Sequence, residues 1–258
     1  MIKAIFFDID GTLVSFQTHR MSERVKEALW TLRRKGVKLL VATGRPMVNI
    51  NNLEGFPFDG FITMNGALTY LDGKIVDGHP LTREDARKVA ALATELDTTA
   101  WVFTEDFSGV NQMTAKATAF AERIHIFPSG FVDLERMAET TDIYEYTFFI
   151  SLEDEHRLLR PILSHADYPR WHPDFTDIVA KGLSKASAAS ILLDRLGIAR
   201  EECMAFGDGG NDVPLIEYAG IGVAMGNAAE EVKAVADLVT RSVDEDGIVA
   251  TLKNFGLL

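Results

Sequence analysis

The chain has 258 residues, of which 47% are hydrophobic and 25% charged, and these are ordinary values for a globular protein. The formal net charge of -12 argues against binding to a nucleic-acid backbone, because that binding depends mainly on Lys and Arg. The single cysteine, Cys203, excludes an internal disulfide, and no apolar stretch approaches the roughly 20 residues that a membrane-spanning helix needs. We therefore expect a cytoplasmic location, with neither nucleic acid nor a membrane as a partner.

Residues 1–80 alternate between strands and helices. A helix is expected over residues 22–36, because apolar residues recur there at helical spacing and Ser22 can cap its start. Residues 68–76 are expected to form a hairpin that turns at Asp72 and Gly73. Short continuous apolar runs predict strands buried on both faces, and these runs are residues 3–7, 37–43 and 60–65. Such alternation is typical of a parallel sheet with helices on both faces.

The pattern changes near residue 81. An amphipathic helix is expected over residues 82–97, where Thr82 and Asp85 have the spacing of a capping box. Further strands are expected at residues 99–104, 146–152, 168–173 and 175–180. The looser connections between these elements predict a separate domain of mixed α and β structure, residues 81–183, inserted into the first one.

Strand-helix alternation returns after residue 184. Helices are expected at residues 185–197, 212–219 and 228–236, and strands at residues 203–208 and 220–225. The predicted fold is therefore α/β. It has a doubly wound, Rossmann-like core with a parallel sheet, residues 1–80 and 184–258, and an inserted α+β cap domain, residues 81–183.

Polar residues lie at strand ends of the predicted core or just beside the point where the chain re-enters it. They are Asp8 and Asp10, then Thr43, Gly44 and Arg45, then Lys185 at a helix start, and finally the run 207–212. Taken singly, each group has an ordinary explanation as a helix cap, a turn, an exposed lysine or a glycine-rich loop. Because ligands bind beyond the carboxyl ends of parallel strands, we expect the groups to meet at one site.

The residue types in these groups suit a metal-assisted reaction. Carboxylates that converge from separate strands repel one another unless a cation lies between them. Oxygen ligands without a nearby Cys or His suit Mg²⁺, and Asp8 and Asp208 are the natural side-chain ligands. A metal ion, the Lys185 ammonium and the Thr43 hydroxyl are together what phosphoryl transfer requires.

The segments "DIDGT", "TGR" and "GDGGND", together with Lys185, resemble in order and spacing the four motifs of the haloacid dehalogenase-like phosphatase superfamily. The size and position of the insertion resemble the type IIB subgroup, which includes the Cof-type sugar-phosphate phosphatases. "ITMNGA" (62–67) and "KGLSKASA" (181–188) are also similar to segments of that subgroup. The resemblance covers the core, whereas over the cap it is architectural only. It implies a Mg²⁺-dependent phosphatase that hydrolyses small phosphorylated metabolites, such as sugar phosphates, through an aspartyl-phosphate intermediate.

The resemblance also implies roles for individual residues. Asp8 would be the nucleophile, Asp10 would act first as general acid and then as general base, and Asp212 would orient Lys185 or a metal-bound water. The metal ligands would be Asp8, Asp208 and, through its backbone carbonyl, Asp10. The phosphate would be bound by Ile9 through its backbone N–H and by Thr43, Gly44, Lys185 and Asn211. The cap would close over the site, exclude water and select the substrate.

Several alternatives remain at this stage. A phosphosugar mutase could use the same core, and a phospho-accepting signalling or binding module could use similar acidic residues without turnover. Arg45 could reach the substrate or pair with a core acid, and Asn65 could line the site or form a turn with Gly66. In the cap, Trp171 could stack on a sugar or belong to the domain core. The sequence predicts neither the oligomeric state nor the cap residues that contact the substrate.

Overall fold

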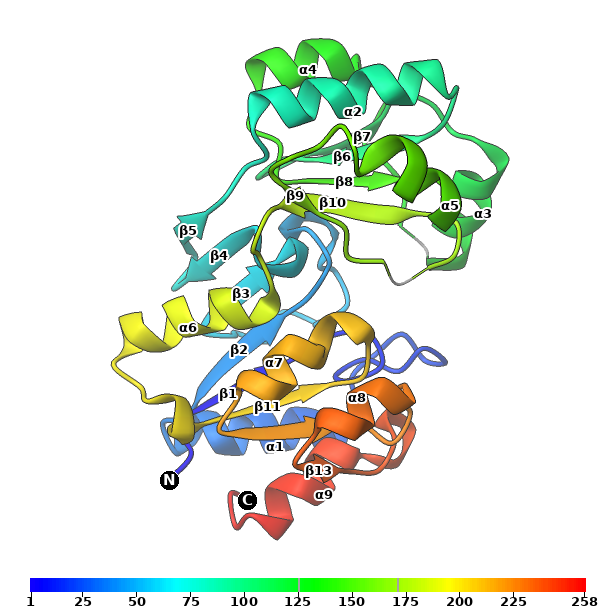
Figure 1. Ribbon diagram of the computed structural model, residues 1–258. Helices are drawn as coiled ribbons and strands as arrows, with labels where there is room; N and C mark the ends of the chain where they lie inside the picture. The colour runs from blue at the N-terminus through cyan, green and yellow to red at the C-terminus, as the bar shows by residue number, and fades with distance from the viewer. Residues whose placement is uncertain (125, 171) are drawn as a thin grey trace. The chain divides into compact units, whose positions relative to one another are not determined.

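The computed structural model describes residues 1–124, 126–170 and 172–258. The chain divides into two compact units, each with its own sheet and apolar core (Figure 1). The first unit comprises Met1–Arg45, Ile50–Asp77 and Ser184–Leu258, and the second comprises Pro46–Asn49 and Gly78–Leu183.

The first unit contains an eight-stranded sheet in the order β13-β12-β11-β1-β2-β3-β4-β5. The strands are β1 (Ala4–Phe7), β2 (Lys38–Ala42), β3 (Gly60–Thr63), β4 (Leu68–Leu71), β5 (Lys74–Gly78), β11 (Cys203–Gly207), β12 (Ile221–Ala224) and β13 (Leu238–Val239). All pairings from β13 across to β3 are parallel, and β3 pairs with β4 antiparallel. The predicted parallel sheet is confirmed.

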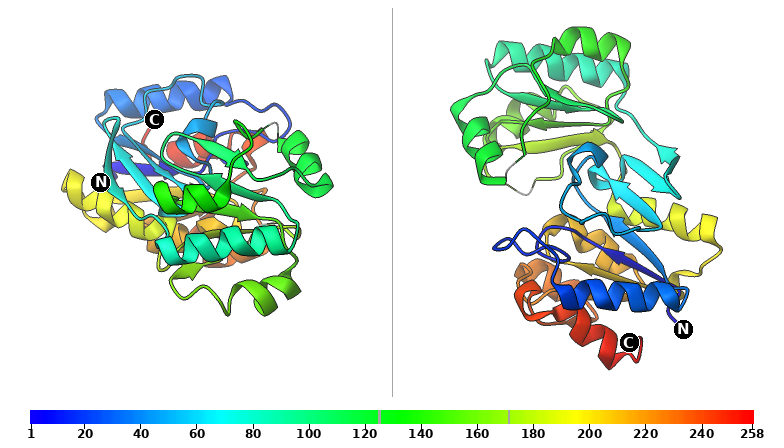
Figure 2. Two further views of the ribbon diagram at one scale, coloured as in Figure 1. Left: turned by 90° about the horizontal axis from the view of Figure 1, so that it is seen from above. Right: turned by 180° about the vertical axis from the view of Figure 1, so that it is seen from behind.

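Helices cover both faces of this sheet. The central strand β1 is buried throughout and sends alternate side chains to opposite faces, so that Ile5 joins one apolar cluster and Phe6 another. The first cluster includes α1 (Glu23–Arg34) and α9 (Gly247–Asn254), which lie side by side in Figure 2. The second includes α6 (Lys185–Leu196), α7 (Val213–Tyr218) and α8 (Glu230–Val235). This is the doubly wound architecture that the sequence predicts.

Local signals in the first unit behave as predicted. Ser22 caps α1 by accepting a hydrogen bond from the backbone N–H of Val25 at 3.2 Å. Between β4 and β5, Asp72 and Gly73 both have positive φ values, 49° and 74°, as a type I′ hairpin turn requires.

The second unit contains a five-stranded sheet in the order β7-β6-β8-β10-β9. Its strands are β6 (Ala100–Phe103), β7 (Ser108–Val110), β8 (Glu145–Phe148), β9 (Ala166–Asp167) and β10 (Thr176–Ala180). Its helices are α2 (Arg83–Glu95), α3 (Ala115–Ile124), α4 (Leu134–Thr140) and α5 (Leu152–Asp154), which continues into a π-helical segment, Glu155–Leu159. Helices α2 and α4 pack together over one face of the sheet (Figure 2).

Two predictions for this unit need correction. The strand predicted at residues 168–173 is absent at residues 168–170, where Pro169 has no backbone N–H to donate, and the two-residue β9 lies just before them. Trp171 lies outside the described residues. Thr82 does cap α2, but the Asp85 carboxylate accepts from the backbone N–H of His165 at 3.1 Å, so the expected capping box is only half formed.

Within the described residues, none of the helices is both long and apolar enough to cross a membrane.

Candidate active site

The polar groups predicted to meet follow neighbouring strands of the first unit. Strand β1 lies between β2 and β11, and its last residue, Phe7, pairs with Val41 on one side and Phe206 on the other. The three strands therefore end at nearly the same level. Asp8, Thr43 and Asp208 follow them and lie at one edge of the sheet.

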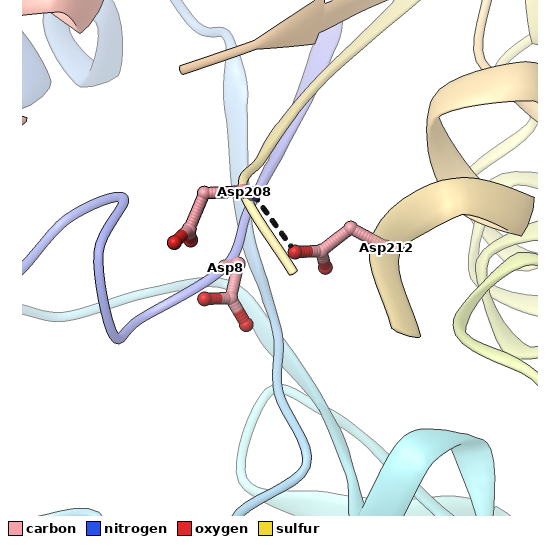
Figure 3. Close-up of side chains that lie close together, drawn as sticks. All are labelled: Asp8, Asp208 and Asp212. Carbon is pink, nitrogen blue, oxygen red and sulfur yellow. Dashed lines mark hydrogen bonds between the residues drawn. The ribbon is translucent and has the colours of Figure 1, made fainter. Parts of the chain in front are cut away.

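Three carboxylates gather at this edge. Asp8, Asp208 and Asp212 each offer a carboxylate oxygen within 4.8 Å of those of the other two (Figure 3). Asp8 and Asp212 are buried, with exposed fractions of 7% and 1%, and Asp208 is partly buried. Figure 3 shows the Asp212 side chain turned toward the backbone of Asp208, whose N–H donates to Asp212 Oδ2 at 3.0 Å.

A buried ammonium group connects two of these carboxylates. Lys185 is the first residue of α6, and its Nζ donates to Asp8 Oδ1 and to Asp212 Oδ1, both at 2.6 Å. Burial by itself would lower the pKa of Lys185, but the attraction of Asp212 and Asp8 outweighs it and raises that pKa above its ordinary value. Lys185 therefore remains charged, and one ammonium group lies among three carboxyl groups.

Two of the clustered aspartates, Asp8 and Asp208, have raised pKa values. Burial, with a further contribution from the nearby Asp212, raises the pKa of Asp208 to about 7. Burial also raises the pKa of Asp8 well above its ordinary value, against the opposing effect of Lys185. Both shifts mean that the protein alone stabilises these ionised carboxylates incompletely, and a bound cation would supply the missing positive charge. The donor set, made only of oxygen atoms, fits a hard divalent cation such as Mg²⁺.

Two residues that the sequence analysis did not assign also hold Asp208. Thr12 Oγ1 donates to Asp208 Oδ1 at 2.9 Å. Asn227 Nδ2 donates to the carbonyl of Gly11 at 2.8 Å and to Asp208 Oδ2 at 3.3 Å. Thr12 is the last residue of the "DIDGT" segment and Asn227 follows β12, so the signal that could have found them is again a polar residue after a core strand.

The chain passes so close to Asp208 that only glycine fits at position 11. Gly11 has a φ of +88°, and a Cβ there would lie 2.2 Å from Asp208 Oδ2. The turn after Asp10 thus depends on this glycine both for its backbone conformation and for the space that Asp208 occupies.

Asp10 pairs with Arg45 instead of joining the carboxylate cluster. Arg45 Nε donates to Asp10 Oδ2 at 2.6 Å, and its Nη2 donates to Asp10 Oδ1 at 2.7 Å. Of the two interpretations of Arg45, the structure shows the ion pair with a core acid. The metal ligand expected from Asp10 is its backbone carbonyl, and that role stays a prediction.

The residues expected to bind phosphate lie around the end of β2. Thr43 Oγ1 accepts from the backbone N–H of Arg45 at 3.0 Å, which leaves its hydroxyl proton free to be donated. Asn211 Nδ2 donates to Asn65 Oδ1 at 2.9 Å beside Gly44. The Ile9 side chain is fully buried in the core, so only its backbone can face a ligand. The Asn65 backbone, with a φ of 55°, forms the expected turn with Gly66, and its side-chain amide contacts Asn211.

Comparison with known proteins identifies the family. Residues 5–252 match the family model described as haloacid dehalogenase-like hydrolase. The chain belongs to this family. The match confirms the resemblance that the four motifs carry, and a solved phosphatase of the same superfamily shares the fold over the whole chain.

The similarity extends along nearly the full length. Phosphatase BT1666 of Bacteroides thetaiotaomicron, a member of the superfamily, is 38% identical, with a TM-score of 0.92 over 100% of this chain and 96% of that one. The subclass IIB sugar phosphatase BT4131 is 39% identical, with a TM-score of 0.91 over 99% of this chain and 100% of that one. YkrA of Bacillus subtilis, which is named as a phosphatase, is 35% identical over 99% of this chain and 98% of its own length.

These matches confirm the predicted type IIB relationship and the predicted class of enzyme. The protein is a haloacid dehalogenase-type phosphatase, that is, a phosphoric monoester hydrolase.

The raised carboxyl pKa values predict how the pH affects cation binding. Because Asp208 holds its proton up to a pKa of about 7, the folded protein binds more protons than the unfolded chain below that pH, and its cation-free stability falls as the pH rises toward it. A divalent cation binds the ionised carboxylates, so MgCl₂ should raise the melting temperature more at about pH 8 than at about pH 5.5. Differential scanning fluorimetry measures both shifts. Equal shifts at the two pH values, or an undiminished shift in Asp208→Asn, would contradict this account.

The close approach at Gly11 predicts that Gly11→Ala disturbs the site beyond its effect on the backbone. The added Cβ displaces the Asp208 carboxylate, so hydrolysis of p-nitrophenyl phosphate should fall by at least about tenfold. Gly36→Ala is the matched control, because Gly36 has a similar φ of +80° and a Cβ added there would meet no atom within 4 Å. It should lower stability by about 1 kcal/mol and leave the rate unchanged. If Gly11→Ala and Gly36→Ala both keep the wild-type rate, the close approach of Gly11 to Asp208 does not matter for hydrolysis.

Proposed function

We propose that this phosphatase hydrolyses small phosphorylated metabolites, principally sugar phosphates, with Mg²⁺ and through an aspartyl-phosphate intermediate. The observation that carries this proposal is the meeting of Asp8, Asp208 and Lys185 beside Thr43 at the carboxyl edge of the parallel sheet. It brings together an oxygen nucleophile, a cation-binding carboxylate pair and an ammonium group. Phosphoryl transfer needs these groups because it depends on alignment and charge neutralisation.

Asp8 and Asp208, with the backbone carbonyl of Asp10, would hold the metal ion. When bound, Mg²⁺ would neutralise negative charge on the phosphoryl oxygens. Asp212 has other partners, since its two oxygens accept from Lys185 and from the backbone N–H groups of Asp208 and Gly209. Its role in the proposal is therefore to hold Lys185 and the loop that carries Asp208.

Asp8 is the proposed nucleophile. Lys185 donates a hydrogen bond to Asp8 Oδ1. A bond forms between one carboxylate oxygen of Asp8 and phosphorus as the bond from phosphorus to the leaving alkoxide breaks. Lys185, Thr43, Gly44 and Asn211 bind the phosphoryl oxygens while this happens.

Asp10 is the proposed proton carrier. In the first step it gives a proton to the leaving alkoxide, and in the second it removes a proton from the water that attacks the aspartyl phosphate and releases inorganic phosphate. The two hydrogen bonds from Arg45 fix the orientation of the Asp10 carboxyl group. The first step requires the protonated form of Asp10 and the second step its ionised form.

The second unit is the proposed cap. An inserted domain of this kind can exclude water while the intermediate forms and can select the organic part of the substrate. The similarity to the sugar phosphatase BT4131 supports sugar phosphates as the substrate class. The cytoplasmic location and the absence of nucleic-acid partners stay predictions from the sequence.

The nucleophile assignment predicts the behaviour of Asp8→Asn. This variant should lose at least about 10³-fold in turnover of p-nitrophenyl phosphate, because the amide cannot form the aspartyl phosphate. Wild-type activity should require Mg²⁺ and stop with EDTA. Asp72→Asn, an equal change at an exposed turn of the same unit, should keep the wild-type rate. Metal-independent turnover, or an active Asp8→Asn with native circular dichroism, would refute the mechanism.

The substrate class needs a separate measurement. A panel of sugar phosphates, nucleotides and phosphorylated amino acids, ranked by kcat/KM, should place sugar phosphates first. Net release of phosphate should not need a sugar bisphosphate activator, which separates a phosphatase from a mutase.

A further inference from the structure

Asn65 has a backbone conformation that few residues other than glycine adopt. It lies in a 3₁₀ turn, Met64–Gly66, directly after β3, with a φ of 55°. Its backbone N–H donates to the carbonyl of Thr43 at 3.2 Å, so the turn is tied to the end of β2. On the other side, a Cβ at Gly66 would lie 2.5 Å from the carbonyl oxygen of Ser184, the residue before Lys185. The turn therefore touches two of the segments that carry proposed phosphate-binding residues.

The side chain of Asn65 reaches a third segment. Asn65 is 4% exposed, and its Oδ1 accepts from Asn211 Nδ2 at 2.9 Å. An ideal Cβ on Gly44 would lie 3.4 Å from Asn65 Oδ1 and 3.5 Å from Asn211 Nδ2. The two amides thus lie against the Gly44 backbone and limit where Asn211 can point.

The other half of the Asn65 amide is unsatisfied. Nδ2 is buried, and it has no hydrogen-bond partner among the described residues. A buried donor without a partner destabilises a fold, and native proteins contain few of them. Asn65 combines this cost with a left-handed backbone, where glycine would be at least as well suited. Fold stability therefore does not explain the unpartnered Nδ2.

We infer that Asn65 is a positioning residue for the phosphate-binding site. Its Oδ1 holds the Asn211 amide beside Gly44, so that the loop after β11 and the end of β2 present their donors to one phosphoryl group. The inference rests on the proposed function, which assigns phosphate contacts to Gly44 and Asn211. Asn65 acts through these residues.

The test uses Asn65→Gly, which removes the amide and suits the positive φ. Inorganic phosphate is the probe, measured as a competitive inhibitor of p-nitrophenyl phosphate hydrolysis by the Mg²⁺-loaded full chain. We expect the inhibition constant for phosphate and the KM to rise about fivefold, as the loss of one hydrogen bond implies. The melting temperature should stay equal to that of the wild type or rise. Asp72→Gly is the matched control, because Asp72 also has a positive φ, 49°, and lies in an exposed turn; its inhibition constant should not change.

A double-mutant cycle shows whether Asn65 acts through Asn211. If it does, Asn65→Gly adds little to the loss of phosphate affinity already caused by Asn211→Ala, and the two effects are strongly non-additive. If instead the fold-changes in the inhibition constant caused by the two substitutions multiply in the double variant, Asn65 does not act through Asn211. That result would overturn the inference.

Two further results would overturn it. One is an unchanged inhibition constant in Asn65→Gly. The other is a clear fall in its melting temperature relative to Asp72→Gly, which would show that Asn65 serves the fold. Failure of the proposed function is distinguishable, because the wild-type protein itself would then neither hydrolyse phosphomonoesters nor be inhibited by phosphate.

Discussion

A buried ammonium shared by two carboxylates is the interaction on which the active site depends. Lys185 contacts both Asp8 and Asp212, and without it these two groups would repel each other at the centre of the site. Asp212 in turn accepts the backbone N–H groups of Asp208 and Gly209. Lys185 therefore fixes the position of Asp212. Asp212 in turn fixes the backbone of the loop that carries the proposed metal ligand Asp208.

The charges of the site fall into two groups. Asp10 and Arg45 form a pair of opposite charges, whereas the three clustered carboxylates have only Lys185 to balance them among the described residues. Burial, together with repulsion from the neighbouring carboxylates, raises the pKa values of Asp8 and Asp208, and this is the physical reason why a divalent cation suits the cluster. The pairing with Arg45 engages only the side chain of Asp10, the proposed proton carrier, and its backbone carbonyl stays the proposed metal ligand.

Close packing of the backbone completes the site. Gly11 leaves room for Asp208, and Gly66 leaves room for the carbonyl before Lys185. At both places a side chain would push apart segments that are far from each other in sequence. Small residues at strand ends thus allow the four motif segments to converge at the edge of one sheet.

The sequence by itself determined the parallel core, the helices on both faces and the segments that form the site, because buried strands, caps and strand-end residues leave local patterns. It did not determine the short strands β7, β9 and β13, which depend on pairing with strands elsewhere in the chain. Nor did it decide between the two interpretations of Arg45, since the partner Asp10 lies 35 residues away. The contacts of Thr12, Asn65 and Asn227 were likewise decided only by the tertiary structure. A side chain's hydrogen-bond partner depends on which strand ends become neighbours, and a local pattern does not contain that information.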